Sequence, residues 1–232
     1  QKTGRKGNLR QARRRLAELA ALSSNARRDF PSKYDALIGL FHSGGLHRGK
    51  SRIANHPGQF VAAVADILDR RNLSPAEAFT VLHRHFGAIT GAGINLLTEI
   101  LHALDNKRFA VMNQNAVSGL ALAGIRDYPL HPTKQNVSAE SYARYCGHAD
   151  TVRRSLGLDD FTELDALFNY AYWRETEEDE ADSKALRLAF ELRYVRKQYA
   201  ILQPIDTTKM IGYTFIDTTF DKLDECVIID KL

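Results

Sequence analysis

The chain has 232 residues, 44% of them hydrophobic and 26% charged, which are values typical of globular domains and exclude a wholly disordered protein. No apolar run approaches the roughly 18 residues that a membrane-spanning helix needs, and no apolar stretch follows the basic N-terminus, so we expect a cytoplasmic protein without a membrane partner. The net charge is +4, and the two cysteines, Cys146 and Cys226, have no metal-ligand spacing around them, which argues against a disulfide framework and a structural zinc site.

The first elements predicted are helices. Residues 1–28 hold nine Lys or Arg and a single acid, Glu18, and within them residues 8–22 place leucines at helical spacing opposite arginines. A basic segment of this kind is typical of proteins that bind a polyanion, although many solvated helices share it. A second helix is expected from near Ser32 to Gly44, and the polar segment 46–57 is expected to be a loop.

Further helices are predicted along the middle of the chain. Ser74, Pro75 and Glu77 form a capping-box pattern at the start of a helix that runs to about His85. The hydrophobic spacing predicts the other helices over 59–71, 94–104, 115–122, 138–156 and 160–173, and an acidic turn or helix start at 175–182 that leads to about Gln198.

The last thirty residues change in character. Residues 210–219 and 225–230 are rich in β-branched and aromatic side chains and predict two short strands joined through 220–224. The expected fold is therefore mainly α with a small C-terminal β element. Its predicted parts are a basic N-terminal helix (1–30), a helical core (31–200) and a β extension packed on that core (201–232).

The segment 86–124 is the most informative part of the chain. The turn Gly91-Ala92-Gly93 allows close approach of another backbone, because glycine tolerates positive φ and has no side chain. A helix follows at once, so free N–H groups and the positive end of its dipole point out of the turn, an arrangement that suits a phosphate.

This segment resembles the helix-hairpin-helix region of the DNA glycosylase superfamily that includes the endonuclease III-like enzymes. In that family a hairpin of the form L-P-G-V-G precedes a helix, and a short apolar run then leads to V-D-T-H-V. Here Ile89–Gly93 occupy the hairpin positions and Phe109–Val117 the second block, with a fitting separation; the resemblance covers about 39 of the 232 residues. It implies a glycosylase-like helical core with its hairpin at 86–104, and DNA contacts by Thr90, Gly91, Gly93 and Ile94.

The chain departs from the family at its catalytic positions. The family's catalytic aspartate falls on Asn113, the lysine that some members use as a nucleophile falls on Asn95, and Thr90 replaces the hairpin proline. An amide is no general base and carries no negative charge, but it can orient a water or bind an extruded base. The resemblance therefore implies DNA binding more strongly than base excision.

Other residues near the hairpin are candidates for the remaining roles. Asp105 and Asp127 are candidates for the missing charge, although each is also an ordinary surface or capping acid by type, and Tyr128 is a candidate for stacking on a flipped base or donating to it. Gln114 and Asn115, next to Asn113, match the hydrogen-bonding edges of bases but are equally good cap residues for the helix 115–122.

The leading hypothesis is a DNA glycosylase-like hydrolase that flips an unusual or modified base into a pocket near Asn113, in repair or in defence against phage DNA. Asn95, Asn113 or Asp127 would position water or stabilise charge, without metal or cofactor, and the expected phosphate contacts beyond the hairpin are Arg13, Arg14, Arg15, Lys107 and Arg108. One alternative is a catalytically silent module that recognises modified DNA. Another is a protein-interaction domain with an acidic partner, which predicts negligible affinity for DNA even at low salt.

Overall fold

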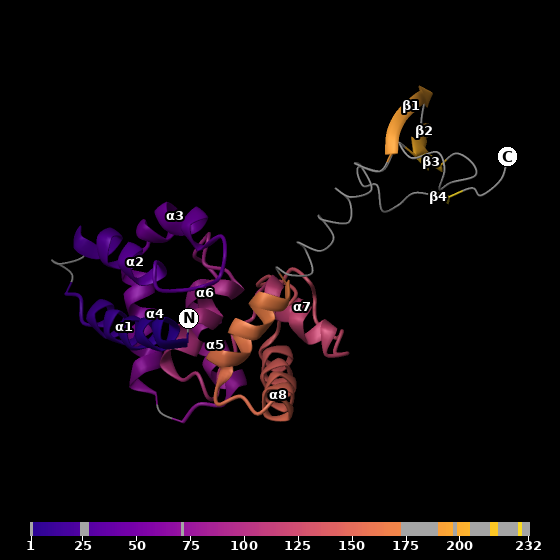
Figure 1. Cartoon of the computed structure of the whole chain (residues 1–232). Helices are drawn as coiled ribbons and strands as arrows, with labels where there is room; N and C mark the ends of the chain where they lie inside the picture. Colours follow the sequence, from indigo (N-terminus) through magenta and orange to yellow (C-terminus); the bar gives the residue numbers. More distant parts are fainter. Residues whose placement is uncertain are drawn as a thin grey trace. The chain divides into compact units, whose positions relative to one another are not determined.

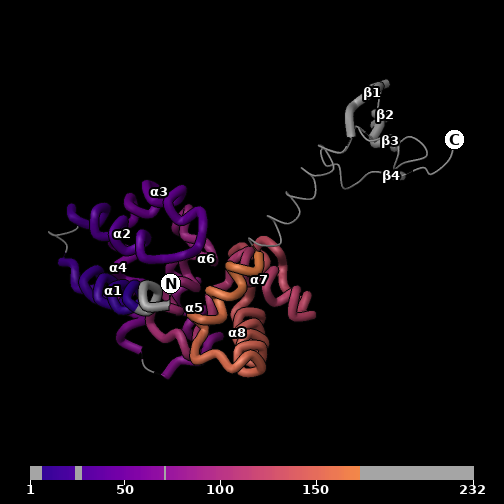
Figure 2. Tube along the Cα trace, viewed as in Figure 1, coloured from indigo at the N-terminus to yellow at the C-terminus, as the bar shows by residue number. Residues whose placement is uncertain are grey.

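The computed structural model divides the chain into two compact units, residues 1–172 and 173–232 (Figure 1). It describes residues 2–23, 28–70 and 72–172 of the first unit, with side chains from residue 7 on, and the backbone of four strands in the second (Figure 2). The first unit is mainly helical, as the sequence predicts. Among the described helices, none combines the length and the apolar character needed to cross a membrane.

The first helices of the unit pack through a shared apolar face. α1 (Lys2–Ala20) contains the predicted basic helix and buries Ala12, Leu16 and Leu19. It packs on α2 (Phe30–Ile38) and α4 (Pro57–Asp69), and the rings of Phe30, Tyr34 and Phe60 lie 5.2–5.7 Å apart between centroids. These aromatic contacts join α2 to α4, because stacked and edge-on rings at this spacing attract one another.

The segment predicted as a loop over 46–57 is partly helical, and that prediction was wrong. Gly45, at φ 80°, begins the 3-10 helix η2 (Leu46–Gly49), which leads directly into α3 (Lys50–Ala54). Leu46 and Ile53 are both buried, so two apolar side chains are enough to anchor these short elements to the core.

The next two helices form the centre of the unit. α5 (Pro75–Phe86) has the predicted capping box: the Ser74 hydroxyl accepts from the Glu77 N–H, and the Glu77 carboxylate accepts from the Ser74 N–H at 2.8 Å. α6 (Ile94–Leu104) is buried along most of its length, and even Thr98, Glu99 and His102 are covered. α6 is therefore fixed on several sides, and its partly exposed residues, Asn95 and Leu104, lie in its first and last turns.

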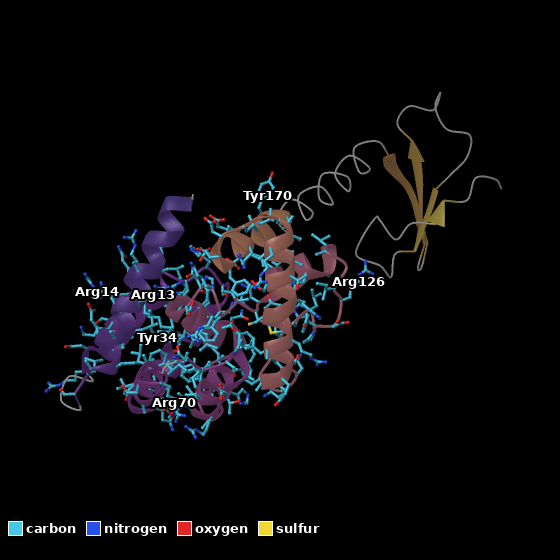
Figure 3. All side chains as sticks on the ribbon, turned by 90° about the horizontal axis from the view of Figure 1, so that it is seen from below. Arg13, Arg14, Tyr34, Arg70, Arg126 and Tyr170 are labelled. Carbon is cyan, nitrogen blue, oxygen red and sulfur yellow. The ribbon has the colours of Figure 1, made fainter. Side chains whose placement is uncertain are left out.

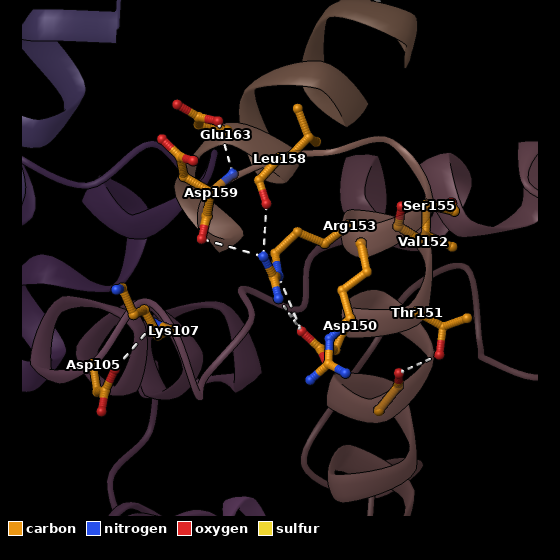
Figure 4. Close-up of polar contacts among 12 residues, drawn as sticks. Asp105, Lys107, Asp150, Thr151, Val152, Arg153, Ser155, Leu158, Asp159 and Glu163 are labelled. Atoms are coloured by element: carbon orange, nitrogen blue, oxygen red, sulfur yellow. Dashed lines mark hydrogen bonds and ion pairs between the residues drawn. The ribbon is translucent and has the colours of Figure 1, made fainter.

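The last helices pack closely on one another. α7 (Gln114–Leu122) crosses the helix over 161–172 at Gly119, where an added Cβ would lie 2.2 Å from Cγ of Phe168. α8 (Ala139–Ser155) ends in a corner held by Arg153, whose guanidinium donates to the carbonyls of Leu158 and Asp159 and pairs with Asp150 at 2.7 Å (Figure 4).

The second unit holds a four-stranded antiparallel sheet in the order β1 (Phe190–Arg196), β2 (Tyr199–Pro204), β3 (Thr214–Asp217) and β4 (Val227–Ile228). β3 and β4 lie inside the two segments predicted as strands. β1 lies where the sequence analysis extended a helix to about Gln198; its residues Phe190 to Tyr194 alternate apolar and polar types, which suits a strand. The acidic stretch 175–182 and the connection 220–224 lie outside the described residues.

Candidate nucleic-acid interface

The turn between α5 and α6 contains Gly91 and Gly93, and the absence of a side chain has a different consequence at each position. Gly91 has φ 94°, and an added Cβ there would lie 3.2 Å from Cα of Gly49, so both its conformation and its packing exclude a side chain. Gly93 is extended and has open space where a Cβ would point. Ile89 and Ala92 are buried and anchor the turn, whereas Thr90 and Gly91 are exposed. Gly93 is thus the glycine whose missing side chain leaves room for a ligand.

The first turn of α6 carries N–H groups without acceptors inside the helix. Gly93 caps the helix without a side chain, and the first helical bond runs from the Leu97 N–H to the Gly93 carbonyl at 3.1 Å. The N–H groups of Ile94, Asn95 and Leu96 come before this bond, so they lie at the positive end of the helix dipole. An anion placed here would meet both the dipole and these donors.

These donors open into a groove of about 370 Å³. Three segments from different parts of the chain line it: Gly44–Leu46 with Arg48, Gly91–Leu96, and Pro132–Gln135. Arg48 is exposed, and its side chain has no ion-pair or hydrogen-bond partner among the described residues. The Lys134 ammonium donates to the carbonyls of Phe86, Gly87 and Ile89, and burial lowers its pKa. The groove therefore combines a free cation with a helix N-terminus.

The two amides at the family's catalytic positions both reach the segment 43–44. Asn95 Nδ2 donates to the Gly44 carbonyl at 3.5 Å, and Asn113 Nδ2 donates to the Ser43 hydroxyl at 2.9 Å. Asn113 is only 9% exposed and is also the N-cap of α7, where its Oδ1 accepts from the Ala116 N–H at 2.9 Å. Both ends of the Asn113 amide are thus engaged in holding the fold.

Glu99 is a polar residue of this region that the sequence analysis missed. It lies in the middle of α6, is 3% exposed, and accepts the N–H groups of His42 at 3.0 Å and Ser43 at 2.7 Å. The signal in the sequence is an acid inside the run Leu96-Leu97-Thr98-Glu99-Ile100-Leu101, where a buried carboxylate requires hydrogen-bond donors. Its donors lie more than fifty residues earlier in the chain, so the sequence did not reveal them.

The candidate basic residues lie away from the turn. Arg13 donates to the carbonyl of Ala103 and to Asn106, at the C-terminal end of α6, and Lys107 and Arg108 follow that end. With 11 residues, α6 is about 16 Å long, so these cations are separated by that length from the Gly91–Gly93 turn. Figure 3 shows Arg13 and Arg14 on the side of the unit opposite Arg126.

Most of these cations also have acidic partners. Arg14 and Arg15 both pair with Glu18, at 3.1 and 3.2 Å, and Arg108 pairs with Asp105 at 2.7 Å while its guanidinium lies over the Phe109 ring. Lys107 is exposed, and its side chain has no partner among the described residues. The paired acids offset part of the positive charge that Arg14, Arg15 and Arg108 bring to the surface.

The remaining candidates have different environments. Tyr128 is 9% exposed, its hydroxyl lies 2.9 Å from His148 Nδ1, and its ring packs on Tyr145, whereas Asp127 is exposed. Gln114 donates to the Tyr172 hydroxyl at 3.1 Å and Asn115 to the Asn169 side chain at 2.6 Å. The contacts of Gln114 and Asn115 join α7 to the helix over 161–172. None of the four residues lines the groove.

Comparison with known proteins places the chain in no family, since no protein-family model, curated protein or solved structure matches it.

Proposed function

We propose that the first unit binds the sugar-phosphate backbone of DNA in the groove at the start of α6. The observation that carries this proposal is the uncapped first turn of α6, whose N–H groups open into a groove that also contains the unpaired Arg48. A phosphate there would accept from the N–H groups of Ile94, Asn95 and Leu96 and would face the positive pole of the helix. The resemblance of residues 86–124 to the helix-hairpin-helix region supports DNA as the polyanion.

The contacts of Asn113 favour a DNA-reading module over an enzyme that excises a base. Its Oδ1 and Nδ2 both have protein partners, Ala116 and Ser43, and releasing either one would uncap α7 or free the Ser43 hydroxyl. Binding to DNA without chemistry needs no such release, because backbone contacts alone fix a protein on DNA. The contacts of Asn113 therefore support a binding module better than an enzyme.

The proposal is tested by two substitutions at one position, Gly93→Asp and Gly93→Asn. The backbone of Gly93 is extended, at φ −97° and ψ −177°, and both side chains are good N-caps, so both variants should unfold at the same or a higher temperature than the wild type. Only the aspartate adds a negative charge where the phosphate would lie. We expect Gly93→Asp to weaken binding of a 20-base-pair duplex at least tenfold, and Gly93→Asn to weaken it less.

Binding is measured by fluorescence anisotropy over a series of salt concentrations. A wild-type protein without salt-dependent affinity for DNA would contradict the proposal and favour the protein-interaction alternative. Equal affinities of the wild type and Gly93→Asp would also contradict it, and would move the contact to another surface of the unit.

A further inference from the structure

The buried carboxylate of Glu99 lies directly behind one wall of the groove. Its Oε1 accepts two consecutive backbone N–H groups, those of His42 and Ser43, at 3.0 and 2.7 Å. The next residues, Gly44 and Gly45, line the groove opposite the first turn of α6. Glu99 therefore joins α6 to the segment 42–45 through the interior of the unit.

The segment 42–45 has few other attachments. The Ser43 hydroxyl accepts from Asn113 at 2.9 Å, and the Gly44 carbonyl accepts from Asn95 at 3.5 Å, which is a long hydrogen bond. Gly45 has φ 80° and contributes no side chain that could anchor the turn. The bonds to Glu99 hold the backbone at His42 and Ser43, and the Arg48 N–H donates to the Gly45 carbonyl at 3.0 Å.

The groups that face Glu99 come from several elements. A small cavity beside it is lined by His42 from the segment after α2, His102 from α6 itself, and Thr162 and Asp165 from the helix over 161–172; its remaining lining residues, Asn8, Leu9, Leu40, Phe41 and Val111, are uncharged. Burial lowers the pKa of His102, whose Nδ1 lies 2.9 Å from the Phe109 carbonyl oxygen and whose Nε2 lies 3.2 Å from the Thr162 hydroxyl. The groups that favour the ionised form of Glu99 are the Ser43 side chain and the backbone N–H groups of Ser43 and His42.

Two opposing effects determine the ionisation of Glu99. Burial, which is the larger effect, and the nearby Asp165 raise the pKa of the Glu99 carboxyl to about 7, while the hydrogen bonds from Ser43 and His42 lower it. Because those bonds favour the ionised form, protonation of the Glu99 carboxyl weakens them, and with them its hold on the segment 42–45.

We infer that Glu99 is a positioning residue that makes backbone binding in the groove pH-dependent: its ionised carboxylate holds the segment 42–45 in place, and its protonation loosens that wall. The effect on DNA affinity rests on the proposed function, whereas the hold on the segment does not. In the ionised form the two hydrogen bonds are charge-assisted, and these are about twice as strong as neutral ones.

The first measurement follows the hold itself. In ¹H–¹⁵N NMR spectra of the full chain between pH 5.5 and 8.5, the backbone amide signals of Ser43 and Gly44 should shift with a midpoint near pH 7. In Glu99→Gln, which keeps an oxygen acceptor but does not titrate, that transition should be absent. The inference would be overturned if the Ser43 amide of the wild type showed no transition, or if Glu99→Gln showed the same transition. The first of these outcomes is measured on the wild type alone.

The second measurement follows the consequence for binding. The ratio of the Kd of Glu99→Gln to that of the wild type, for the same duplex, should be about 5 at pH 8.5 and should approach 1 below pH 6. The control is Glu77→Gln, an exposed carboxylate that also accepts a backbone N–H, from Ser74, and whose ratio should stay constant. A constant ratio for Glu99→Gln would overturn the link to binding.

The two measurements separate the two proposals. Wild-type protein that shows the Ser43 transition but binds no DNA at any pH would reject the proposed function and leave the hold by Glu99 in place. Wild-type protein that binds DNA in a salt-dependent way without the Ser43 transition would reject the inference and leave the proposed function in place.

Discussion

The backbones of Gly49 and Gly91 lie against each other, and a Cβ added to Gly49 would be 2.8 Å from the carbonyl oxygen of Gly91. This contact joins the end of η2 to the turn before α6, although the two glycines are 42 positions apart in the sequence. It is the packing reason for a glycine at position 91, and it is independent of any ligand.

The first prediction concerns this contact. Gly49 has φ −89°, which any residue adopts, so Gly49→Ala adds only the steric conflict and should destabilise the protein by about 1–3 kcal/mol. Urea denaturation measures the change. The matched control is Gly93→Ala, which is also at a helix N-cap but has nothing within 4 Å of the added methyl group, so only the poorer capping by alanine remains and the loss should be smaller, about 0.5 kcal/mol. Equal effects of the two substitutions would show that the turn and η2 are not in contact.

The second prediction concerns the crossing of α7 and the helix over 161–172. Gly119→Ala would place a methyl group 2.2 Å from Cγ of the buried Phe168, so it should lower the stability by about 1–3 kcal/mol, and Phe168→Leu in the same chain should restore part of it. The control is Gly147→Ala in the interior of α8, where the space is open and alanine should stabilise by about 0.5–1 kcal/mol. A stabilising Gly119→Ala would contradict the close crossing.

The third prediction concerns the pH dependence of stability. The pKa of Glu99 is about 7 in the folded chain and 4.5 is its ordinary value, so the folded state binds this proton more tightly, and stability is lost as the pH rises through 7. Glu99→Gln removes this term, so its stability relative to the wild type should increase by on the order of 3 kcal/mol between pH 5 and pH 8. Chemical denaturation at several pH values measures the difference. A difference that stays constant with pH would contradict the raised pKa.

The fourth prediction concerns base excision. If the domain only reads DNA, the wild type, Asn113→Ala and Asp127→Ala should all leave unmodified and heavily modified phage DNA without alkali-labile breaks. Asn113→Ala should in addition lose about 1 kcal/mol of stability with the cap of α7, whereas Asn113→Asp keeps a cap oxygen. Breaks made by the wild type and lost in one variant would instead establish a glycosylase and locate its catalytic group.

The fifth prediction separates the two ends of α6. Arg48→Ala should weaken DNA binding and lower the slope of log Kd against log salt by about one, because Arg48 lines the groove. Lys107→Ala removes an exposed, unpaired cation beyond the other end of the helix and should leave that slope unchanged. The opposite result would place the DNA on the basic residues around Arg13 and Lys107.

Local patterns allowed the correct prediction of local features. The capping box of Ser74 and Glu77 depends on residues three positions apart, and it is present. η2 and α3 escaped prediction because only Leu46 and Ile53 anchor them, which is too few apolar positions to define a period.

The arrangement of the candidate site could not be predicted, because it depends on contacts between distant segments. The hydrogen bonds of Glu99 to residues 42–43 and the contact of Gly49 with Gly91 are of this kind. The place of Arg13 beside the end of α6 also depends on the packing of α1 on α6, which neither composition nor spacing reveals.

The contact of Arg13 with the last turn of α6 has a consequence for the electric field around the unit. Its guanidinium donates to the Ala103 carbonyl, where the helix carries partial negative charge, so the negative pole of α6 is screened while the positive pole stays open. The negative pole, about half an elementary charge, is thus offset by Arg13, whereas the positive pole at the first turn is not. The basic helix α1 can thus strengthen attraction of a polyanion to the opposite end of α6 without touching it.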